Sequence, residues 1–223
     1  VGIFSAFVPT CSSYQIYPTL YGGDMLFRQS LLNIDTQDIA DKVHKLRPYW
    51  IQRLEVPFYT LGRCAYLDGK TSEYANEIKE TNPILYSEFK DLYGIVGGNL
   101  ANLLNEPIYL DENLAFPSFH IAESHPYFTI EGGKWHQDYP HTTLGLGDKD
   151  PLTFTVAIQL PSDGAGLDYI DLDGEQHYLE YVERGIVIHD GSIEHRISPA
   201  KSYKPNEYRI TLQGHLIRVD GVL

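Results

Sequence analysis

The chain has 223 residues, and 43% of them are hydrophobic, so a single domain with a substantial core is expected. Its formal net charge of -13 at pH 7 argues against nucleic acid as a partner, because phosphate binding needs clustered lysine and arginine side chains. The apolar runs are too short to cross a bilayer, and the first residues lack the grading of a signal peptide, so no membrane partner is expected.

Cysteine is scarce, with Cys11 and Cys64 as the two examples. Two cysteines do not make a disulfide framework, and the pattern leaves their redox state open. A cytoplasmic location fits this low count. The sequence leaves open the oligomeric state and whether residues precede Val1.

The half of the chain before Pro117 has a helical pattern. Residues 36–46 carry apolar side chains at helical spacing behind Asp35 or Thr36 as an N-cap, which predicts an amphipathic helix. A second helix is predicted over residues 83–104, although two glycines weaken its middle. The stretch 54–67 between them is expected to be a short strand or a loop.

After Pro117 the chain breaks into short β-rich segments separated by turns. The predicted strands are Ser118 to Ile130, Thr153 to Leu160, Leu167 to Leu172, His177 to Val182, Gly185 to His189, His195 to Ser198 and Tyr208 to Val219. Such spacing is typical of an antiparallel sandwich or jelly roll. The fold class is therefore mainly β with flanking helices (α+β).

A candidate metal site comes from His136, Asp138 and the distant His195. His136 and Asp138 are two positions apart after the first predicted β segment, so their side chains can turn to the same side. Two imidazoles and one carboxylate can hold one face of an octahedral Fe(II) and leave the other face open. A His-x-Asp pair by itself is a weak signal, and its position beside these strands gives it weight.

A candidate anion site lies 14 positions after His195, at Arg209 in the predicted last strand. Arg209, Thr211 and Gln213 alternate on one face of that strand. A guanidinium on an inward face needs an anion, and it can hold a carboxylate through two charge-assisted hydrogen bonds. Thr211 can add a hydroxyl hydrogen bond to the same carboxylate.

Taken in order and spacing, His136 to Asp138, Gly185 to Gly191, His195 to Pro199 and Tyr208 to Thr211 resemble the Fe(II)/2-oxoglutarate-dependent dioxygenases. The resemblance covers roughly Ser118 to Val219. It implies a double-stranded β-helix (jelly roll, cupin-like) core over residues 118–223. Within one domain, 1–223, residues 1–117 are then the helical part that buttresses the core and lines the substrate site.

The resemblance also implies the cofactors. His136, Asp138 and His195 would bind Fe(II), and Arg209 with Thr211 would bind the 5-carboxylate of the cosubstrate 2-oxoglutarate, with O2 as the oxidant. The implied reaction hydroxylates an unactivated C–H bond and releases succinate and CO2. Asp138 favours hydroxylation over halogenation, because halogenating members replace this carboxylate with a small residue, although desaturation, ring closure or epoxidation could use the same ligands.

Two more residues are expected to bind the cosubstrate. Tyr127 lies in the first β segment, and Gln159 shares a strand face with Thr153, Thr155 and Ala157. For Tyr127, an ordinary place on a half-buried strand is the competing interpretation, and for Gln159 it is a strand face turned to solvent. His189 and the adjacent Asp190 point apart on a strand, so a structural role is favoured over a second metal pair.

The substrate is expected to be a small molecule, such as an amino acid or a natural-product intermediate. Some upstream side chains either contact this substrate or are ordinary surface or core: the aromatics Tyr49, Trp50, Phe58, Tyr59 and Tyr66, and the arginines Arg28, Arg47, Arg53 and Arg63. Two other classes stay open: a cupin-like metalloenzyme that does not use 2-oxoglutarate, and a non-catalytic jelly-roll binding module.

Overall fold

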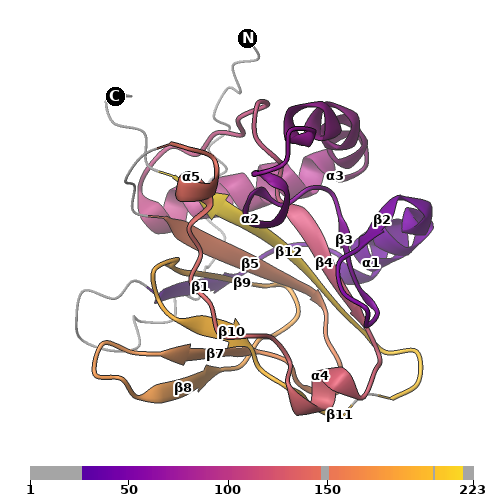
Figure 1. Cartoon of the computed structure of the whole chain (residues 1–223), viewed down its shortest axis with the longest axis vertical. Coiled ribbons are helices and arrows are strands. Elements are labelled where there is room, and N and C mark those ends of the chain that lie inside the picture. Colours follow the sequence, from indigo (N-terminus) through magenta and orange to yellow (C-terminus); the bar gives the residue numbers. More distant parts are fainter. Residues whose placement is uncertain (1–26, 147–150, 203, 218–223) are drawn as a thin grey trace.

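The computed structural model describes residues 27–146, 151–202 and 204–217. Cys11 and Val219 lie outside these ranges. The described chain forms three antiparallel sheets, and the two longest helices lie together beside the main sheet (Figure 1). The mainly β fold class with flanking helices is thereby confirmed.

The main sheet has seven strands, and the N-terminal and C-terminal halves of the chain both contribute to it. In spatial order its strands are β1 (Phe27–Leu31), β9 (Gly185–Asp190), β5 (Leu152–Gln159), β12 (Tyr208–Leu216), β4 (Ser118–Glu123), β3 (Phe58–Leu61) and β2 (Trp50–Gln52). Strands β1, β2 and β3 come from the N-terminal part, where the sequence predicted helices and a short strand or loop at 54–67, so this part contributes more strands to the sheet than predicted.

Two smaller sheets accompany the main sheet. The first contains β10 (His195–Ile197), β7 (Leu167–Ile170) and β8 (Gln176–Leu179), and the second contains β11 (Ala200–Ser202) and β6 (Asp163–Gly164). Val187 of the main sheet and Leu167 of the small sheet are buried in one apolar cluster, which joins the two layers. The jelly-roll core is therefore two sheets packed face to face.

The two faces of the main sheet differ in chemistry, as strand alternation requires. On β12, Ile210 and Leu212 are fully buried in the main hydrophobic core with side chains of α1 (Thr36–Lys45) and α3 (Tyr74–Leu104). The alternate positions Arg209 and Thr211 are also buried, but they point to the opposite face. Helices thus cover the apolar face, and the polar face is turned inward (Figure 1).

Helix α1 begins and ends close to the predicted bounds. The Asp35 carboxylate accepts hydrogen bonds from the backbone N–H groups of Gln37 and Asp38, both at 3.1 Å, so it is the N-cap. Ile39 and Val43 are buried against the sheet. The apolar spacing read from the sequence therefore marks the face that packs on the core.

Helix α3 is longer than predicted, because it starts at Tyr74 and passes through Pro83. Tyr74 and Ile78 in the added turns are buried, and this packing outweighs the hydrogen bond that a proline removes. The helix departs from helical geometry at Phe89, six residues after the proline. No helix in the described part of the chain is long and apolar enough to cross a membrane.

Several predicted bounds were wrong. The segment Ser118 to Ile130 is a strand only as far as Glu123, and its end forms the short helix α4 (Tyr127–Ile130) after Pro126. The last strand ends at Leu216. The stretch 54–67 contains both β3 and a short helix, α2 (Ala65–Asp68), and a further short helix, α5 (Pro140–Thr143), follows the His-x-Asp pair.

Candidate metal and cosubstrate site

The structure brings together the three predicted metal ligands. The ligand atoms of His136, Asp138 and His195 all lie within 4.8 Å of one another. His136 and His195 are held side by side by two backbone hydrogen bonds of 2.9 Å, and Asp138 N donates to Gly191 O at 2.8 Å. A side chain at Gly191 would meet Asp138 O at 2.9 Å, so this close approach needs glycine.

The donor set fits a divalent metal ion. Nδ1 of His136 lies 2.8 Å from Lys134 O, and Nδ1 of His195 lies 2.8 Å from Ile193 O. A carbonyl oxygen only accepts, so each neutral ring carries its proton on Nδ1 and keeps a lone pair on Nε2. Both Nε2 atoms face Asp138, at 3.8 Å from Oδ1 and 3.4 Å from Oδ2.

The distances between the ligand atoms are also consistent with a bound metal ion. Ligand atoms bound about 2.1 Å from one ion lie about 3 Å apart when adjacent. The observed 3.4 and 3.8 Å exceed that value slightly, so a small inward movement of the rings suffices. The side chain of His136 is 42% exposed, whereas those of Asp138 and His195 are buried, so the group opens to solvent on the His136 side.

Charge within the group also suits a cation. Burial would raise the pKa of Asp138, but the hydrogen bond to His195 and the nearby histidines hold that pKa well below its usual range. Burial lowers the pKa of His136. Burial opposes protonation of His195 too, but the hydrogen bond to Asp138 raises its pKa. A metal ion would take the place of the proton that His195 shares with Asp138.

His189 has a structural position, as predicted. It is buried, its ring centroid lies 4.5 Å from that of His195, and burial lowers its pKa to about 4. Asp190 turns the other way and accepts hydrogen bonds from the backbone N–H and hydroxyl of Ser192. The two side chains point apart and form no second metal pair.

The predicted anion site lies on the polar face of β12. Arg209 is 4% exposed, its Nε donates to Ala165 O at 3.1 Å, and an Nη donates to Thr211 Oγ1 at 3.2 Å. Its guanidinium carbon also lies 5.7 Å from the ring centroid of Tyr181. Both hydrogen-bond acceptors are neutral groups, and a buried guanidinium is suited to anchor a carboxylate.

Gln159 and Tyr127 lie near that end of β12. Gln159 is opposite Ile210, and its Oε1 is buried with no hydrogen-bond partner in the described part of the chain. The strand face with Thr153, Thr155 and Ala157 is buried and is therefore not a solvent face, and the pairing of β5 with β12 shifts register beside Gln159. Tyr127 is on α4 and not on a strand, and its backbone N–H donates to His125 Nδ1 at 3.2 Å.

Comparison with known proteins locates the fold. Neither a protein-family model nor a curated protein matches this sequence. Among solved structures, an N-substituted L-amino acid dioxygenase from Burkholderia ambifaria matches with a TM-score of 0.54 and 14% identity, over 87% of this chain and 83% of that one. A prolyl 4-hydroxylase from Pseudomonas putida matches at 0.44 and 14%, over 89% and 95%. A 2OG-Fe(II) oxygenase family protein from Caulobacter crescentus matches at 0.46 and 13%, over 86% and 76%.

The chain shares its fold with the Burkholderia ambifaria dioxygenase. At such low identity the likeness describes the arrangement of elements and leaves the substrate open. The jelly-roll core expected from the sequence is present, and three strands from residues 27–61 extend its larger sheet.

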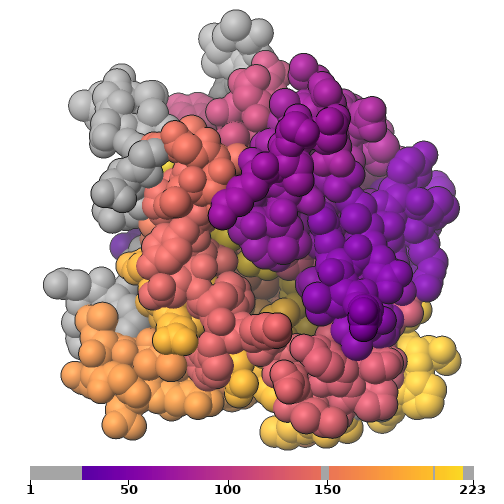
Figure 2. All heavy atoms as spheres, viewed as in Figure 1, coloured from indigo at the N-terminus to yellow at the C-terminus, as the bar shows by residue number. Residues whose placement is uncertain are grey.

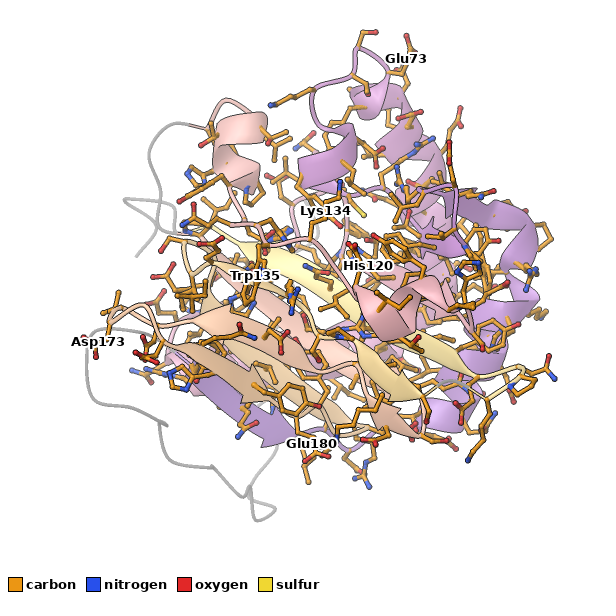
Figure 3. The ribbon with its side chains drawn as sticks, turned by 60° about the horizontal axis from the view of Figure 1, so that its bottom comes forward. Glu73, His120, Lys134, Trp135, Asp173 and Glu180 are labelled. Atoms are coloured by element: carbon orange, nitrogen blue, oxygen red, sulfur yellow. The ribbon has the colours of Figure 1, made fainter. Side chains whose placement is uncertain are left out.

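A cleft opens on one face of the molecule. Figure 2 shows the surface hollowed between the purple N-terminal segment and the salmon segment that carries the His-x-Asp pair, with yellow atoms of β12 at its floor. In Figure 3 the labelled His120 lies near the middle of the molecule beside β12, whereas Glu73 and Glu180 lie at opposite outer edges of the molecule. The polar face of the main sheet is thus the floor of the cleft.

Some of the upstream aromatics reach this polar face. Tyr66 of α2 packs against His120 and His215, with ring centroids 6.1 and 5.9 Å apart, and Phe58 packs against His120 at 6.0 Å. Burial lowers the pKa of His120 to about 3, so this histidine is neutral. By contrast, Tyr49 is 55% exposed.

The upstream arginines have partners within the protein. Arg53 makes a bidentate pair with Asp68 at 2.7 and 2.8 Å, and Arg63 pairs with Glu77 at 2.7 Å. Two further pairs are Arg47 with Glu123 and Arg28 with the backbone of Leu103. These contacts favour the structural interpretation of all four arginines over substrate binding.

Two residues beside the metal group were not singled out from the sequence as site residues. Thr153 Oγ1 donates to Asp138 Oδ2 at 2.7 Å, and His215 Nδ1 lies 3.2 Å from the same hydroxyl. Only the strand alternation of Thr153 with Thr155 indicated an inward position. Their arrangement beside Asp138 depends on the register of β12 on β5, which no local pattern reveals.

Proposed function

We propose that this chain is an Fe(II)- and 2-oxoglutarate-dependent oxygenase that hydroxylates an unactivated C–H bond of a small metabolite and releases succinate and CO2. The observation that carries the proposal is the pair of fixed tautomers at His136 and His195. Both rings present an Nε2 lone pair toward Asp138, at 3.8 and 3.4 Å. A buried arginine on the same polar face supplies the carboxylate anchor.

In this proposal each residue has one task. His136, Asp138 and His195 bind the iron, which when loaded with 2-oxoglutarate and O2 supplies the oxidising chemistry. Arg209 holds the 5-carboxylate of 2-oxoglutarate. Thr211 Oγ1 accepts from Arg209, so its own proton is available to the same carboxylate. Tyr181 packs on the guanidinium and, with the buried strand face, excludes water from the ion pair.

Gln159 is proposed to reach the same carboxylate through its amide. A carboxylate accepts hydrogen bonds, so Gln159 must present Nε2 where Oε1 now lies buried without a partner. Rotation of the amide by half a turn achieves this, because oxygen and nitrogen occupy equivalent positions. For Tyr127, an approach from α4 at the same end of β12 is the matching proposal.

For the substrate, N-substituted L-amino acids are the first class to test. The support is the Burkholderia ambifaria dioxygenase, which matches over 87% of this chain. Amino acids and natural-product intermediates are small enough for a cleft between α2 and the His-x-Asp segment. Hydroxylation is the proposed outcome because the carboxylate of Asp138 occupies the ligand position that a halide would need.

A cupin-like metalloenzyme without 2-oxoglutarate is the rival proposal, and Arg209 weighs against it. Such an enzyme needs no buried guanidinium on the polar face, because its reaction involves no cosubstrate carboxylate for that guanidinium to bind. A non-catalytic binding module has no use for two histidines fixed with Nε2 toward a carboxylate.

Turnover in the presence of Fe(II), ascorbate and 2-oxoglutarate tests the proposal. A panel of N-acetyl- and N-methyl-L-amino acids is offered under 18O2, and succinate is measured together with product mass. We expect succinate and a product that gains one 18O atom, and both should vanish in Asp138→Ala. Metal-loaded, folded protein that releases no succinate with any member of a wide substrate panel would contradict the assignment.

A further inference from the structure

Three side chains form a row beneath the metal group, one from each of three adjacent strands. Thr153 of β5 is directly opposite His189 of β9 on one side and His215 of β12 on the other. All three point to the polar face, and Thr153 is fully buried. The row contacts two metal ligands, because His189 packs on His195 and Thr153 bonds to Asp138.

The hydroxyl of Thr153 has a single proton, which decides the direction of its hydrogen bonds. Asp138 Oδ2, at 2.7 Å, can only accept, so the proton points to the carboxylate. The lone pairs of Thr153 Oγ1 are then left for His215 Nδ1 at 3.2 Å, which must be the protonated nitrogen of that ring. The opposite direction would place hydroxyl lone pairs against a buried carboxylate oxygen.

The two hydrogen bonds therefore run in one direction: His215 donates to Thr153, and Thr153 donates to Asp138. His215 Nδ1 is 4.0 Å from Asp138 Oδ2, too far for a direct hydrogen bond, so His215 acts on the carboxylate through the hydroxyl. The ring of His215 is held in turn by Tyr66, edge to face at a centroid distance of 5.9 Å. The His215 ring and the Thr153 hydroxyl therefore each have a neighbour that restricts their rotation.

We propose that Thr153 is a positioning residue for the metal ligand Asp138, and that His215 orients the Thr153 hydroxyl for that task. One carboxylate oxygen of Asp138 is thereby kept in place by protein, and the group enters metal binding already oriented. This inference rests on the metal site of the proposed function. It does not depend on 2-oxoglutarate or on the identity of the substrate.

Cobalt(II) affinity, measured by anaerobic calorimetry without 2-oxoglutarate, tests this role. Loss of a hydrogen-bonding partner behind a metal ligand lowers metal affinity about 10- to 100-fold. We expect that loss for Thr153→Val, which keeps the shape and removes the hydroxyl, and near wild-type affinity for Thr153→Ser. His215→Phe should weaken binding, and His215→Asn should restore much of it by placing an amide N–H where Nδ1 is. The visible absorption of bound cobalt should change in Thr153→Val and not in Thr153→Ser.

The double variant Thr153→Val/His215→Phe shows whether His215 acts on Asp138 through Thr153 or independently of it. If His215 acts through Thr153, the double variant should bind cobalt no more weakly than Thr153→Val alone. Thr155→Val is the matched control, since it lies on the same strand face and its hydroxyl bonds to Tyr181. Its cobalt affinity should stay within about twofold of wild type. Thermal unfolding of the metal-free variants identifies any that fail to fold.

The outcomes separate this inference from the proposed function. Unchanged cobalt affinity in folded Thr153→Val would overturn the positioning role of Thr153, and additive losses in the double variant would overturn the orienting role of His215. Either result would leave the oxygenase proposal standing. Wild-type protein that binds cobalt, shows the predicted losses and yet ignores 2-oxoglutarate would overturn the oxygenase and retain the positioning role. Failure of wild-type protein to bind cobalt would overturn both.

Discussion

Replacing Arg209 separates cosubstrate binding from metal binding. In Arg209→Met the guanidinium is lost, and with it two charge-assisted hydrogen bonds to the 5-carboxylate in the proposed complex. Such bonds contribute about 1.5–3 kcal/mol each, so about 3–6 kcal/mol is lost. At about 1.4 kcal/mol for each factor of ten, the Kd of 2-oxoglutarate should rise about 10²- to 10⁴-fold.

The same substitution should leave cobalt or iron affinity nearly unchanged. Two hydrogen bonds of Arg209 go to Ala165 O and Thr211 Oγ1, and neither acceptor belongs to the metal group. Loss of these two bonds leaves a buried carbonyl without its donor, so we expect unfolding to become easier by about 1–3 kcal/mol. Arg209→Lys keeps a charge without the planar fork and should fall between wild type and Arg209→Met.

Titration of the anaerobic Fe(II) protein with 2-oxoglutarate measures this effect, and calorimetry with Co(II) alone measures the metal affinity. Thermal unfolding of each variant shows that it is folded at the assay temperature. Equal loss of metal and cosubstrate binding in a folded Arg209→Met protein would refute the reasoning, because it would place Arg209 in the metal group. Unchanged 2-oxoglutarate affinity would refute the anchor.

Three further outcomes are expected. Asp68→Asn should reduce the free energy of unfolding by about 3–5 kcal/mol at pH 7, because it leaves Arg53 without its charged partner. Burial raises the pKa of Asp68, but the hydrogen bond from Arg53 outweighs burial and lowers it, so the ion pair stabilises the fold above about pH 4. In denaturant titrations the difference in unfolding free energy between wild type and Asp68→Asn should therefore shrink as the pH falls below that value. Gly191→Ala should weaken Co(II) binding, since its Cβ would meet Asp138 O at 2.9 Å. Gly97→Ala in α3, where a Cβ would meet no atom within 4 Å, should instead raise the free energy of unfolding by about 0.5–1 kcal/mol. Equal effects of the two substitutions would contradict the steric argument. Co(II) at about 100 times its Kd should stabilise wild type by about 2.7 kcal/mol and leave the melting temperature of His136→Ala unchanged.

Much of the site was predictable because strand alternation is a local property. Arg209 and Thr211 could be assigned to one face from their spacing alone, and the structure places both on the buried polar face. The helix at residues 36–45 was also predictable, because its cap and its apolar spacing are both local signals. His136 and Asp138 needed the wider resemblance, since a single His-x-Asp pair carries little information.

Other features depended on contacts between distant parts of the chain. The strand β1 pairs with β9 about 160 positions later, and this long-range pairing gives a five-residue segment its order. Tyr127 was placed on a strand because the segment is rich in aromatic and β-branched residues, but Pro126 starts a helical turn there. The link from His215 through Thr153 to Asp138 required the register of β12 on β5, which periodicity does not specify.

The central claim is that His136, Asp138 and His195 hold Fe(II) in a site that accepts 2-oxoglutarate. Anaerobic addition of Fe(II) and then 2-oxoglutarate to the folded protein tests it most directly, by visible absorption. We predict a weak charge-transfer band that needs both additions, disappears in His136→Ala and requires far more 2-oxoglutarate in Arg209→Met. Folded, iron-loaded protein that develops no such band at saturating 2-oxoglutarate would contradict the claim.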